Sequence, residues 1–325
     1  MIKVKWAAQG KKKYTNIDIV SCTWSGTENQ ASRTLEFTIP SNPYDKSFKK
    51  TMPKIALGDR VKLYDGKKLL FMGIITSREK TAAIGTASYS AYDYMHYLLR
   101  STVSRVFRDT TPKKATISLC KQVGVKTGAL QDPKKFISKA IYKEKSIYDI
   151  IINLYRKASS KKTKYMPVMN ANKFSVVKKG TDTKVILDQK KDITGATYHD
   201  TTDNMVNFVQ IYNDRYEKAG SAKNDKQIKK YGTYMQAYTK QKDVDAMSEA
   251  KKLLVGITKE ASVEAIGNIK CVAGKSLKIK DSATGLTGKF YISSDTHTFQ
   301  NGVHMMSLEL SYVNTQEQGA EQEKE

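Results

Sequence analysis

Residues 274–313 read GKSLKIKDSATGLTGKFYISSDTHTFQNGVHMMSLELSYV, and this stretch predicts three short strands joined by glycine turns. Its last turn, Asn301-Gly302, lies between two runs of alternating apolar residues. Asn and Gly tolerate the positive φ that a two-residue hairpin turn requires. We therefore predict an antiparallel β-meander that ends in a tight hairpin.

A second stretch, near the N-terminus, has the same glycine rhythm. Gly58 precedes the strand VKLYD as Gly274 precedes LKIKD, and further glycines follow at similar intervals. This pattern indicates two diverged copies of one β unit, although unrelated meanders also have turns at this spacing. The predicted structural turn positions are Gly58, Gly73, Gly85, Gly274, Gly288, Asn301 and Gly302.

The periodicity divides the chain into four parts. Residues 1–92 alternate with period two and predict strands, whereas residues 93–190 predict an α-rich insert with small α/β segments. Residues 191–313 return to strands, with a loop and helix insertion at about 214–260, and residues 314–325 predict a disordered acidic tail. The expected helices are 92–101, capped by Asp93, 116–123, 146–159, capped by Ser146, and 244–257, and residues 218–230 are expected to be a mobile loop.

The 325 residues carry a formal charge of +24, which favours acidic partners. Eleven basic and only two acidic side chains lie between Arg156 and Lys191. A solvated lysine-rich face explains this run, and nucleic-acid binding is the alternative. Nucleic-acid binding is the less favoured of the two, because the basic residues are nearly all Lys and lack interleaved Arg and aromatic residues.

The composition gives no sign of a membrane segment or a metal site. The longest apolar run, residues 69–75, is too short to span a bilayer, and the N-terminus lacks the apolar core of a signal peptide. We therefore expect synthesis in a cytoplasm and no membrane partner. Cys22, Cys120 and Cys271 are widely spaced, so neither a disulfide framework nor a zinc site is indicated, and no cofactor is expected.

Asp295 and His297 are the only residues that suggest acid/base chemistry. They share one face of a strand, but no nucleophile is nominated beside them. The expected hairpin register places His304 across from Phe299 and His297 across from Met306, so the two histidines are not expected to pair as ligands. We predict that Asp295 or His297 makes a local hydrogen bond, and that the chain has no catalytic, metal-binding or cofactor-binding residue.

Two further stretches resemble ligand-binding motifs but lack residues that those motifs require. The Gly-Lys-Ser at residues 274–276 lacks the first glycine of a phosphate-binding loop, because position 269 is Ile. Asp243 and Asp245 alternate as in a calcium loop, but the required Gly and Glu are missing. Acidic residues at a helix N-terminus explain these two aspartates.

Three motifs together resemble a known family. LGDRVKLYDGKKLLFMGIITS, AYDYMHYLLRS and AGKSLKIKDSATGLTGKFYISSDTHTFQNGVHMMSLEL are similar to baseplate hub proteins of contractile phage tails. The closest similarity is to the XkdQ/YqbQ type of Bacillus prophages and tail-like bacteriocins. More distant relatives are the late control protein D of tailed phages and the N-terminal part of VgrG.

The resemblance implies an α+β fold, mainly β, with two similar antiparallel β-barrel domains separated by an α-rich insert. It also implies a homotrimer that presents six barrels and joins the hexameric tail tube, or a tube initiator, to the trimeric spike. A tape measure and a LysM-type baseplate protein are further expected partners. Unlike VgrG, the chain ends in an acidic tail, so we expect spike and lysin activities to reside in partner chains.

The favoured hypothesis is therefore a structural, non-enzymatic hub assembled into the baseplate of a tail particle. Two rivals remain at this point. A tail-associated cell-wall hydrolase would use Asp295 or His297, and a basic nucleic-acid-binding protein would use residues 156–191 with steep salt dependence.

Overall fold

The computed structural model describes residues 2–28, 32–160 and 163–313. The chain divides into two compact units, of which the larger comprises Met1–Ala196 with Ser262–Glu325 and the smaller comprises Thr197–Ala261. The tail expected at residues 314–325 lies outside the described residues. Every helix in the described ranges is too short or too polar to cross a bilayer.

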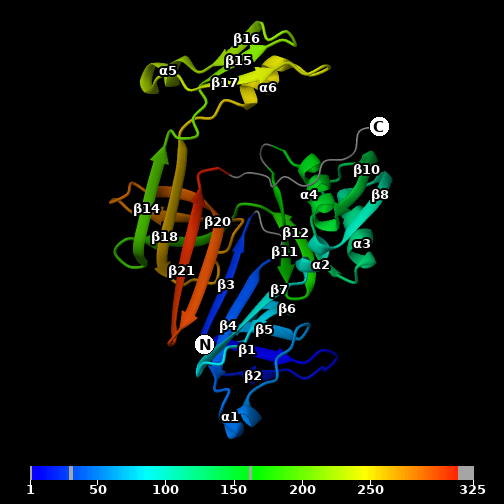
Figure 1. The fold of residues 1–325 in the computed structure, drawn as a ribbon, viewed down its shortest axis with the longest axis vertical. Coiled ribbons are helices and arrows are strands. Elements are labelled where there is room, and N and C mark those ends of the chain that lie inside the picture. The colour runs from blue at the N-terminus through cyan, green and yellow to red at the C-terminus, as the bar shows by residue number, and fades with distance from the viewer. Residues whose placement is uncertain (1, 29–31, 161–162, 314–325) are drawn as a thin grey trace. The chain divides into compact units, whose positions relative to one another are not determined.

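Strands dominate the fold, which confirms the α+β, mainly β class. Among the described residues, thirteen strands form one main sheet (Figure 1). Its N-terminal strands are β1 (Ile2–Ala7), β2 (Thr15–Ile17), β3 (Ser21–Thr27), β4 (Thr34–Ser41), β5 (Arg60–Asp65), β6 (Lys68–Glu79) and β7 (Gly85–Asp93), with helix α1 (Lys46–Thr51) between β4 and β5. Its C-terminal strands are β13 (Thr181–Asp188), β14 (Ile193–Thr201), β18 (Thr258–Ile266), β19 (Lys275–Lys280), β20 (Thr287–Gln300) and β21 (Val303–Ser311).

The predicted C-terminal meander is confirmed as β19, β20 and β21. β20 pairs antiparallel with both β19 and β21, and Gln300 pairs with Val303 across the hairpin. Asn301 and Gly302 have φ values of 52° and 77°, as a two-residue primed turn requires. The sequence therefore located this hairpin and its register correctly.

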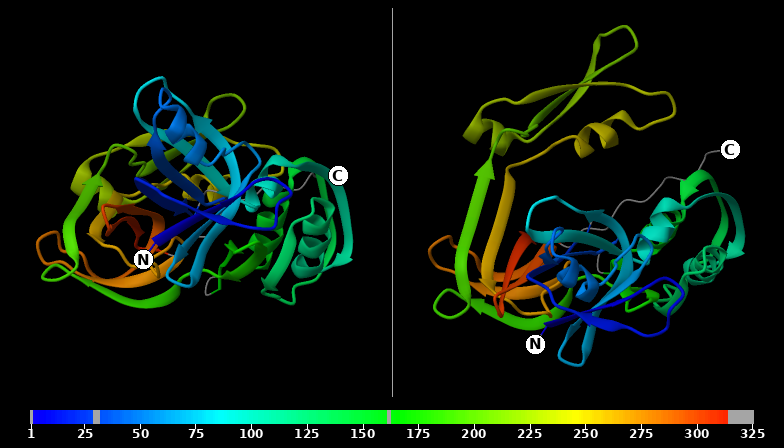
Figure 2. Two further views of the ribbon diagram at one scale, coloured as in Figure 1. Left: turned by 90° about the horizontal axis from the view of Figure 1, so that it is seen from below. Right: turned by 60° about the horizontal axis from the view of Figure 1, so that its bottom comes forward.

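The N-terminal and C-terminal groups of strands share one sheet. The strand order runs β14-β18-β21-β20-β3-β4-β7-β6-β5-β1-β2, with β13 paired to β19 and β19 paired to β20. β20 and β3 make the link, and both views of Figure 2 show the orange-red strands continuing beside the blue ones. The two groups expected as separate barrel domains are thus joined edge to edge.

The two groups have the same internal order. β3-β4-β7-β6-β5-β1 matches β14-β18-β21-β20-β19-β13 position by position. The middle strand of each group carries a register shift at one equivalent place, after Ile75 in β6 and after Ile292 in β20. The amide of Gly58 donates to Ile75 O at 2.9 Å, and that of Gly274 donates to Ile292 O at 2.8 Å. These shared irregularities support duplication, because regular meanders do not require them.

The copies differ in their last pair. β1 runs antiparallel to β5, whereas β13 runs parallel to β19. Residues 94–180 lie between the two groups of strands and form the insert, and β13 follows directly after them. The insert was expected at 93–190, but β13 lies within that range and belongs to the main sheet. The insert therefore ends before β13.

The described residues of the insert form three helices and two small sheets. Helix α4 (Ile147–Ala158) begins at the predicted cap, where the Ser146 side chain accepts from the amide of Asp149, and its apolar stripe forms the core. α2 is capped at Tyr94 rather than at Asp93, although the Asp93 carboxylate accepts from Met95 N at 2.9 Å. The other elements are α2 (Met95–Arg100), α3 (Pro112–Gln122), β8 (Thr102–Thr110), β9 (Lys126–Leu130), β10 (Ile137–Ser146), β11 (Tyr165–Asn170) and β12 (Lys173–Lys178).

The smaller unit contains a three-stranded sheet and two helices, together with residues 197–201 of β14 and 258–261 of β18. Its complete elements are β15 (Phe208–Tyr212), β16 (Lys218–Lys223), α5 (Asp225–Tyr231), β17 (Met235–Thr239) and α6 (Ala246–Lys252). The prediction of a mobile loop at residues 218–230 is wrong, because β16 and α5 occupy these residues. Their polarity misled the prediction, since β16 is an edge strand that buries only Ala222 and α5 buries no residue. α6 is shorter than predicted, and the Asp245 carboxylate caps its start at Ala246.

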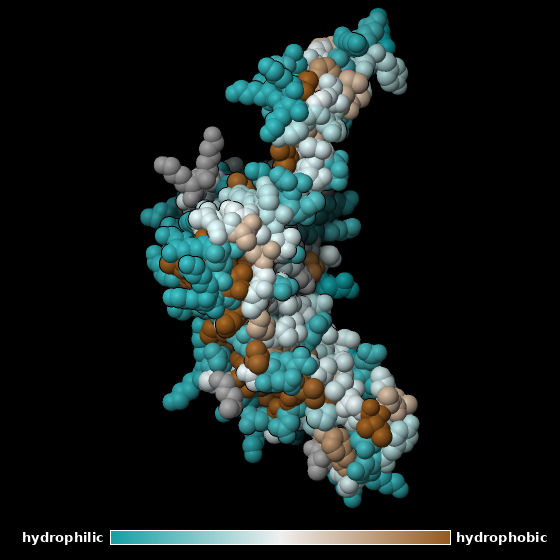
Figure 3. Space-filling model, turned by 90° about the vertical axis from the view of Figure 1, so that its left-hand side faces the viewer, coloured by the Kyte–Doolittle hydropathy of each residue, from teal (hydrophilic) through white to brown (hydrophobic). Residues whose placement is uncertain are grey.

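β14 is an outer strand of the main sheet, because β18 is its sole strand partner among the described residues. Figure 3 views the molecule from the side on which β14 lies in Figure 1. Hydrophilic residues dominate this view, and hydrophobic ones gather mainly in a band across its lower middle.

Candidate interaction site

The junction between the two copies is built by β20 and β3. They pair antiparallel over seven residues, from Ser294 opposite Thr27 to Gln300 opposite Ser21. The second half of β20 makes this contact, while its first half pairs with β19. The register shift after Ile292 bends β20, so that the strand leaves β19 and continues beside β3.

A buried ion pair spans this junction. The Asp295 carboxylate accepts two hydrogen bonds from the Arg33 guanidinium and one from the amide of Ala273 at 2.6 Å. Asp295 is fully buried, and the Arg33 side chain is 19% exposed. A two-pronged arginine–carboxylate contact is among the strong charge-assisted hydrogen bonds. It fixes the first copy against the second at one orientation.

The strand β3 is shaped to receive this arginine. Trp24 lies beneath the guanidinium, 4.0 Å from its centre to the ring, which is a cation–π arrangement. Gly26 is directly opposite Asp295, and a Cβ there would lie 2.5 Å from Arg33 Nη1. Gly26 therefore leaves the space that the guanidinium fills.

His297 continues the buried network. Its Nε2 lies 2.9 Å from the carbonyl oxygen of Cys271, and a carbonyl only accepts, so Nε2 carries the proton. Nδ1 then accepts from His304 Nε2 at 3.0 Å. Burial lowers the pKa of His297, and burial together with its histidine neighbour lowers the pKa of His304 to about 4. Both rings are therefore neutral at pH 7.

These contacts refine two expectations about Asp295, His297 and His304. The expected pairs, His297 with Met306 and Phe299 with His304, are present, but the two rings meet on the diagonal. Diagonal neighbours on one sheet face are within reach of long and aromatic side chains, which the directly opposite register does not reveal. The local hydrogen bond expected of Asp295 or His297 is made by His297, with His304 seven residues away, whereas Asp295 binds Arg33, 262 residues away.

The predicted glycine turns fall into two kinds. Gly58, Gly85, Gly274, Gly288 and Gly302 have positive φ, although Gly85 begins β7 and Gly288 lies in β20. Gly73 instead lies inside β6, where a Cβ would come 2.2 Å from the carbonyl oxygen of Tyr92. Gly73 is therefore required by close packing, and its assignment as a turn position is wrong.

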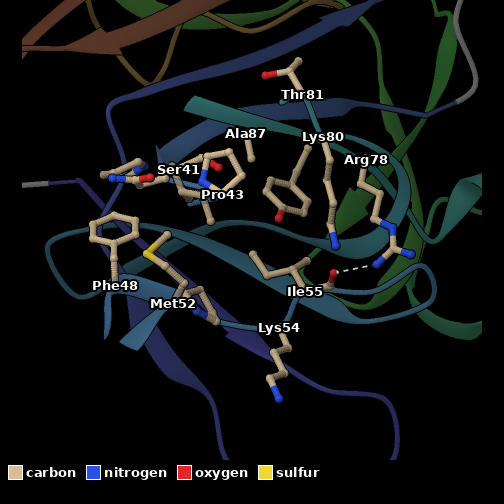
Figure 4. Close-up of a pocket in the computed structure, with 15 residues that line it drawn as sticks. Ser41, Pro43, Phe48, Met52, Lys54, Ile55, Arg78, Lys80, Thr81 and Ala87 are labelled. Atoms are coloured by element: carbon tan, nitrogen blue, oxygen red, sulfur yellow. Dashed lines mark hydrogen bonds between the residues drawn. The ribbon is translucent and has the colours of Figure 1, made fainter. Parts of the chain in front are cut away.

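In the first copy, β6 takes the place of β20, and a pocket lies beside its C-terminal end. A hollow of about 440 Å³ lies beside the exposed end of β6, and we call it the α1 pocket. Figure 4 shows Phe48 and Met52 on one side and Lys80 and Arg78 on the other, with Arg78 donating to Ile55 O. The pocket is further lined by Ile39, Pro40, Ser41, Asn42, Pro43, Pro53, Lys54, Ile55, Thr81, Ala87 and Tyr89.

The next question is whether the described residues contain a group of metal-ligating side chains or an accessible thiol. No three His, Cys, Asp or Glu side chains there are grouped to hold a metal ion. Cys22, Cys120 and Cys271 are buried and unpaired, and burial raises the pKa of each thiol to about 12.

This fold is that of phage tail proteins. The 43 kDa tail protein of prophage MuSo2 from Shewanella oneidensis superposes with a TM-score of 0.71 at 12% identity, covering 95% of this chain and 98% of that one. A type VI secretion component of Escherichia coli, described as structurally similar to the T4 tail proteins gp27 and gp5, gives a TM-score of 0.54 at 9% identity, covering 99% and 79%.

The chain belongs to the YQBQ-like family, whose model matches residues 22–311. It is also similar to the phage-like element PBSX protein XkdQ of Bacillus subtilis, with 23% identity over 313 residues. That match covers 92% of this chain and 94% of the relative. The resemblance in the two glycine-marked meanders is thereby confirmed at the level of the family.

Proposed function

We propose that this chain is a structural hub of a contractile-tail baseplate, a homotrimer that joins the hexameric tail tube to the trimeric spike. The family and the phage-tail fold support a place in the tail. The hub role rests on one observation, the duplicated six-strand unit. Three chains supply six such units, so one ring can match a sixfold tube on one face and a threefold spike on the other.

The direct partners in this proposal are the tube or a tube-initiator protein, the spike and two further copies of the chain. A tape measure and a LysM-type baseplate protein are additional candidate neighbours. The charge of +24 suits acidic surfaces on these partners. In this proposal the chain reaches the baseplate by assembly after synthesis in the cytoplasm, and nucleic acid is not a partner.

The proposed role is non-enzymatic. Asp295 and His297 are fully buried, and the Asp295 carboxylate is occupied by Arg33 and Ala273. A substrate cannot approach them without opening the junction between the two copies. This burial disfavours the cell-wall hydrolase that was the main enzymatic rival.

The test is imaging of assembled tail particles that contain the chain. We expect three copies in a central ring, between the last tube ring and the spike. Particles in which the chain lies outside this ring, or forms no ring, would refute the proposal. As a control for the rival, purified chain on a cell-wall zymogram should give no clearing, and Asp295→Asn should change nothing in that assay.

A further inference from the structure

The positive charge of the chain is concentrated in the insert. Residues 94–180 carry twenty basic and four acidic side chains, so they hold a formal charge of +16 out of the total of +24. The rest of the chain contributes only +8. A charge far from zero destabilises a compact state through self-repulsion and attracts partners of the opposite sign. The insert is therefore the part of the chain best suited to an acidic partner.

Within the insert, β8 and β10 form a two-stranded ribbon whose two sides differ. Phe107 and Ala140 lie opposite each other and are buried in the core that α3 and α4 share, and Figure 1 shows both strands beside these helices. Neighbouring strand residues point to opposite faces, so the residues next to this buried pair lie on the outer side. Two cross-strand pairs there form what we call the ribbon face: Arg108 with Lys139, and Val106 with Ile141.

The ribbon face combines two cations with two aliphatic side chains. Arg108 and Lys139 are both exposed and lie directly opposite each other. Like charges at directly opposite strand positions repel and are destabilising. Beside them, Val106 is 50% exposed and Ile141 is half-buried. A partner whose carboxylates bridge the two cations would remove the repulsion, and an apolar side chain on that partner would cover the aliphatic pair.

We infer that the ribbon face binds an acidic segment of a neighbouring tail protein. The carboxylates of that segment meet Arg108 and Lys139, and an apolar side chain packs against Val106 and Ile141. An apolar patch with a polar surround is the usual anatomy of a protein–protein interface. This inference rests on the proposed function, because the baseplate supplies the neighbouring protein.

The aliphatic pair favours a protein over a nucleic acid as the partner. A nucleic acid is held by cations along its phosphate backbone and by aromatic rings that stack on its bases. The ribbon face contains no aromatic residue, and half of its residues are aliphatic. Val106 and Ile141 offer contact area to an apolar side chain, whereas neither can bind a phosphate. The chemistry of the ribbon face therefore matches an acidic polypeptide.

Peptide binding to the purified full-length chain tests the charges. The probe is a fluorescent peptide with a leucine flanked by glutamates, and the same peptide with glutamine in place of glutamate should bind weakly. Arg108→Glu with Lys139→Glu should weaken binding of the glutamate peptide by roughly tenfold at low salt, and the loss should shrink as salt screens the charges. The matched control, Lys12→Glu with Lys13→Glu, changes the net charge equally at exposed residues outside the insert and should bind as the unmodified chain does. Equal losses in the two variants would overturn the inference, because binding would then follow net charge alone.

Two single changes separate binding from folding and protein from nucleic acid. Arg108→Glu alone places opposite charges across the ribbon, so hydrogen exchange in β8 and β10 should become slower while the peptide binds more weakly. Weaker binding with slower exchange cannot come from unfolding of the insert. Val106→Ser should weaken the peptide about threefold through lost apolar contact and leave binding of an unrelated DNA duplex unchanged. A chain that binds the duplex more tightly than the peptide at the same ionic strength would overturn the assignment of a protein partner.

Imaging of assembled tail particles separates this inference from the proposed function. With the unmodified chain, we expect a different protein to contact the ribbon face of each copy. With Arg108→Glu and Lys139→Glu together, we expect the central ring to form without that contact. A central ring whose ribbon face is bare, is covered by residues 314–325 of the chain itself, or keeps its contact in the double variant refutes the inference alone. Absence of the central ring with the unmodified chain refutes the proposed function.

Discussion

Removing the Asp295 carboxylate should destabilise the larger unit strongly. Asp295→Ala leaves the Arg33 guanidinium without its partner and the Ala273 amide without its acceptor. Breaking a buried ion pair from one side costs about 3–5 kcal/mol. Arg33 remains 19% exposed and still lies over Trp24, so we expect the lower part of this range, about 3 kcal/mol. Asp295→Asn keeps an acceptor for Ala273 and should cost less.

The assay is chemical denaturation monitored at the β3–β20 junction by hydrogen exchange, because a 325-residue chain need not unfold in one step. A double-mutant cycle with Arg33→Met isolates the coupling between the two side chains. Asp182→Asn is the matched control, since Asp182 pairs with Lys184 at the surface and should leave the junction unchanged. A coupling below about 0.5 kcal/mol would refute the role given to this ion pair.

Three further changes probe the same region. Gly267→Ala would place a Cβ 2.1 Å from the His304 ring, and overpacking should cost about 1–3 kcal/mol, whereas Gly195→Ala meets only ordinary contacts and should be tolerated. Burial raises the pKa of Asp93 to about 7, so its contribution to stability falls as pH rises from about 4 to about 7. Asp93→Asn should therefore gain stability relative to the unmodified chain over that range in urea denaturation, and parallel pH profiles would contradict this. Gly302→Ala forces a side chain into φ 77° and should destabilise the hairpin by about 1 kcal/mol, measured as faster hydrogen exchange at β20 and β21.

The mainly β class and the position of the last meander were accessible from local chemistry. The Asn301-Gly302 turn and its flanking alternation determine a hairpin, because the backbone and the side-chain period agree within about ten residues. Ser146 and the apolar stripe after it located α4 for the same reason. The polar elements β16 and α5 were not predicted, because they bury too little apolar surface to produce a periodic pattern in the sequence.

Sequence by itself determined the two glycine-marked β units, the main hairpin register and the membership of a phage-tail family, since each depends on neighbouring residues or on motifs. Tertiary structure alone decided that the two units share one sheet and that Arg33 reaches Asp295 across 262 positions. It also decided that the two histidine rings meet on the diagonal. Such contacts depend on which strand edges meet in space, and no local pattern encodes a pairing between strands so distant in the chain.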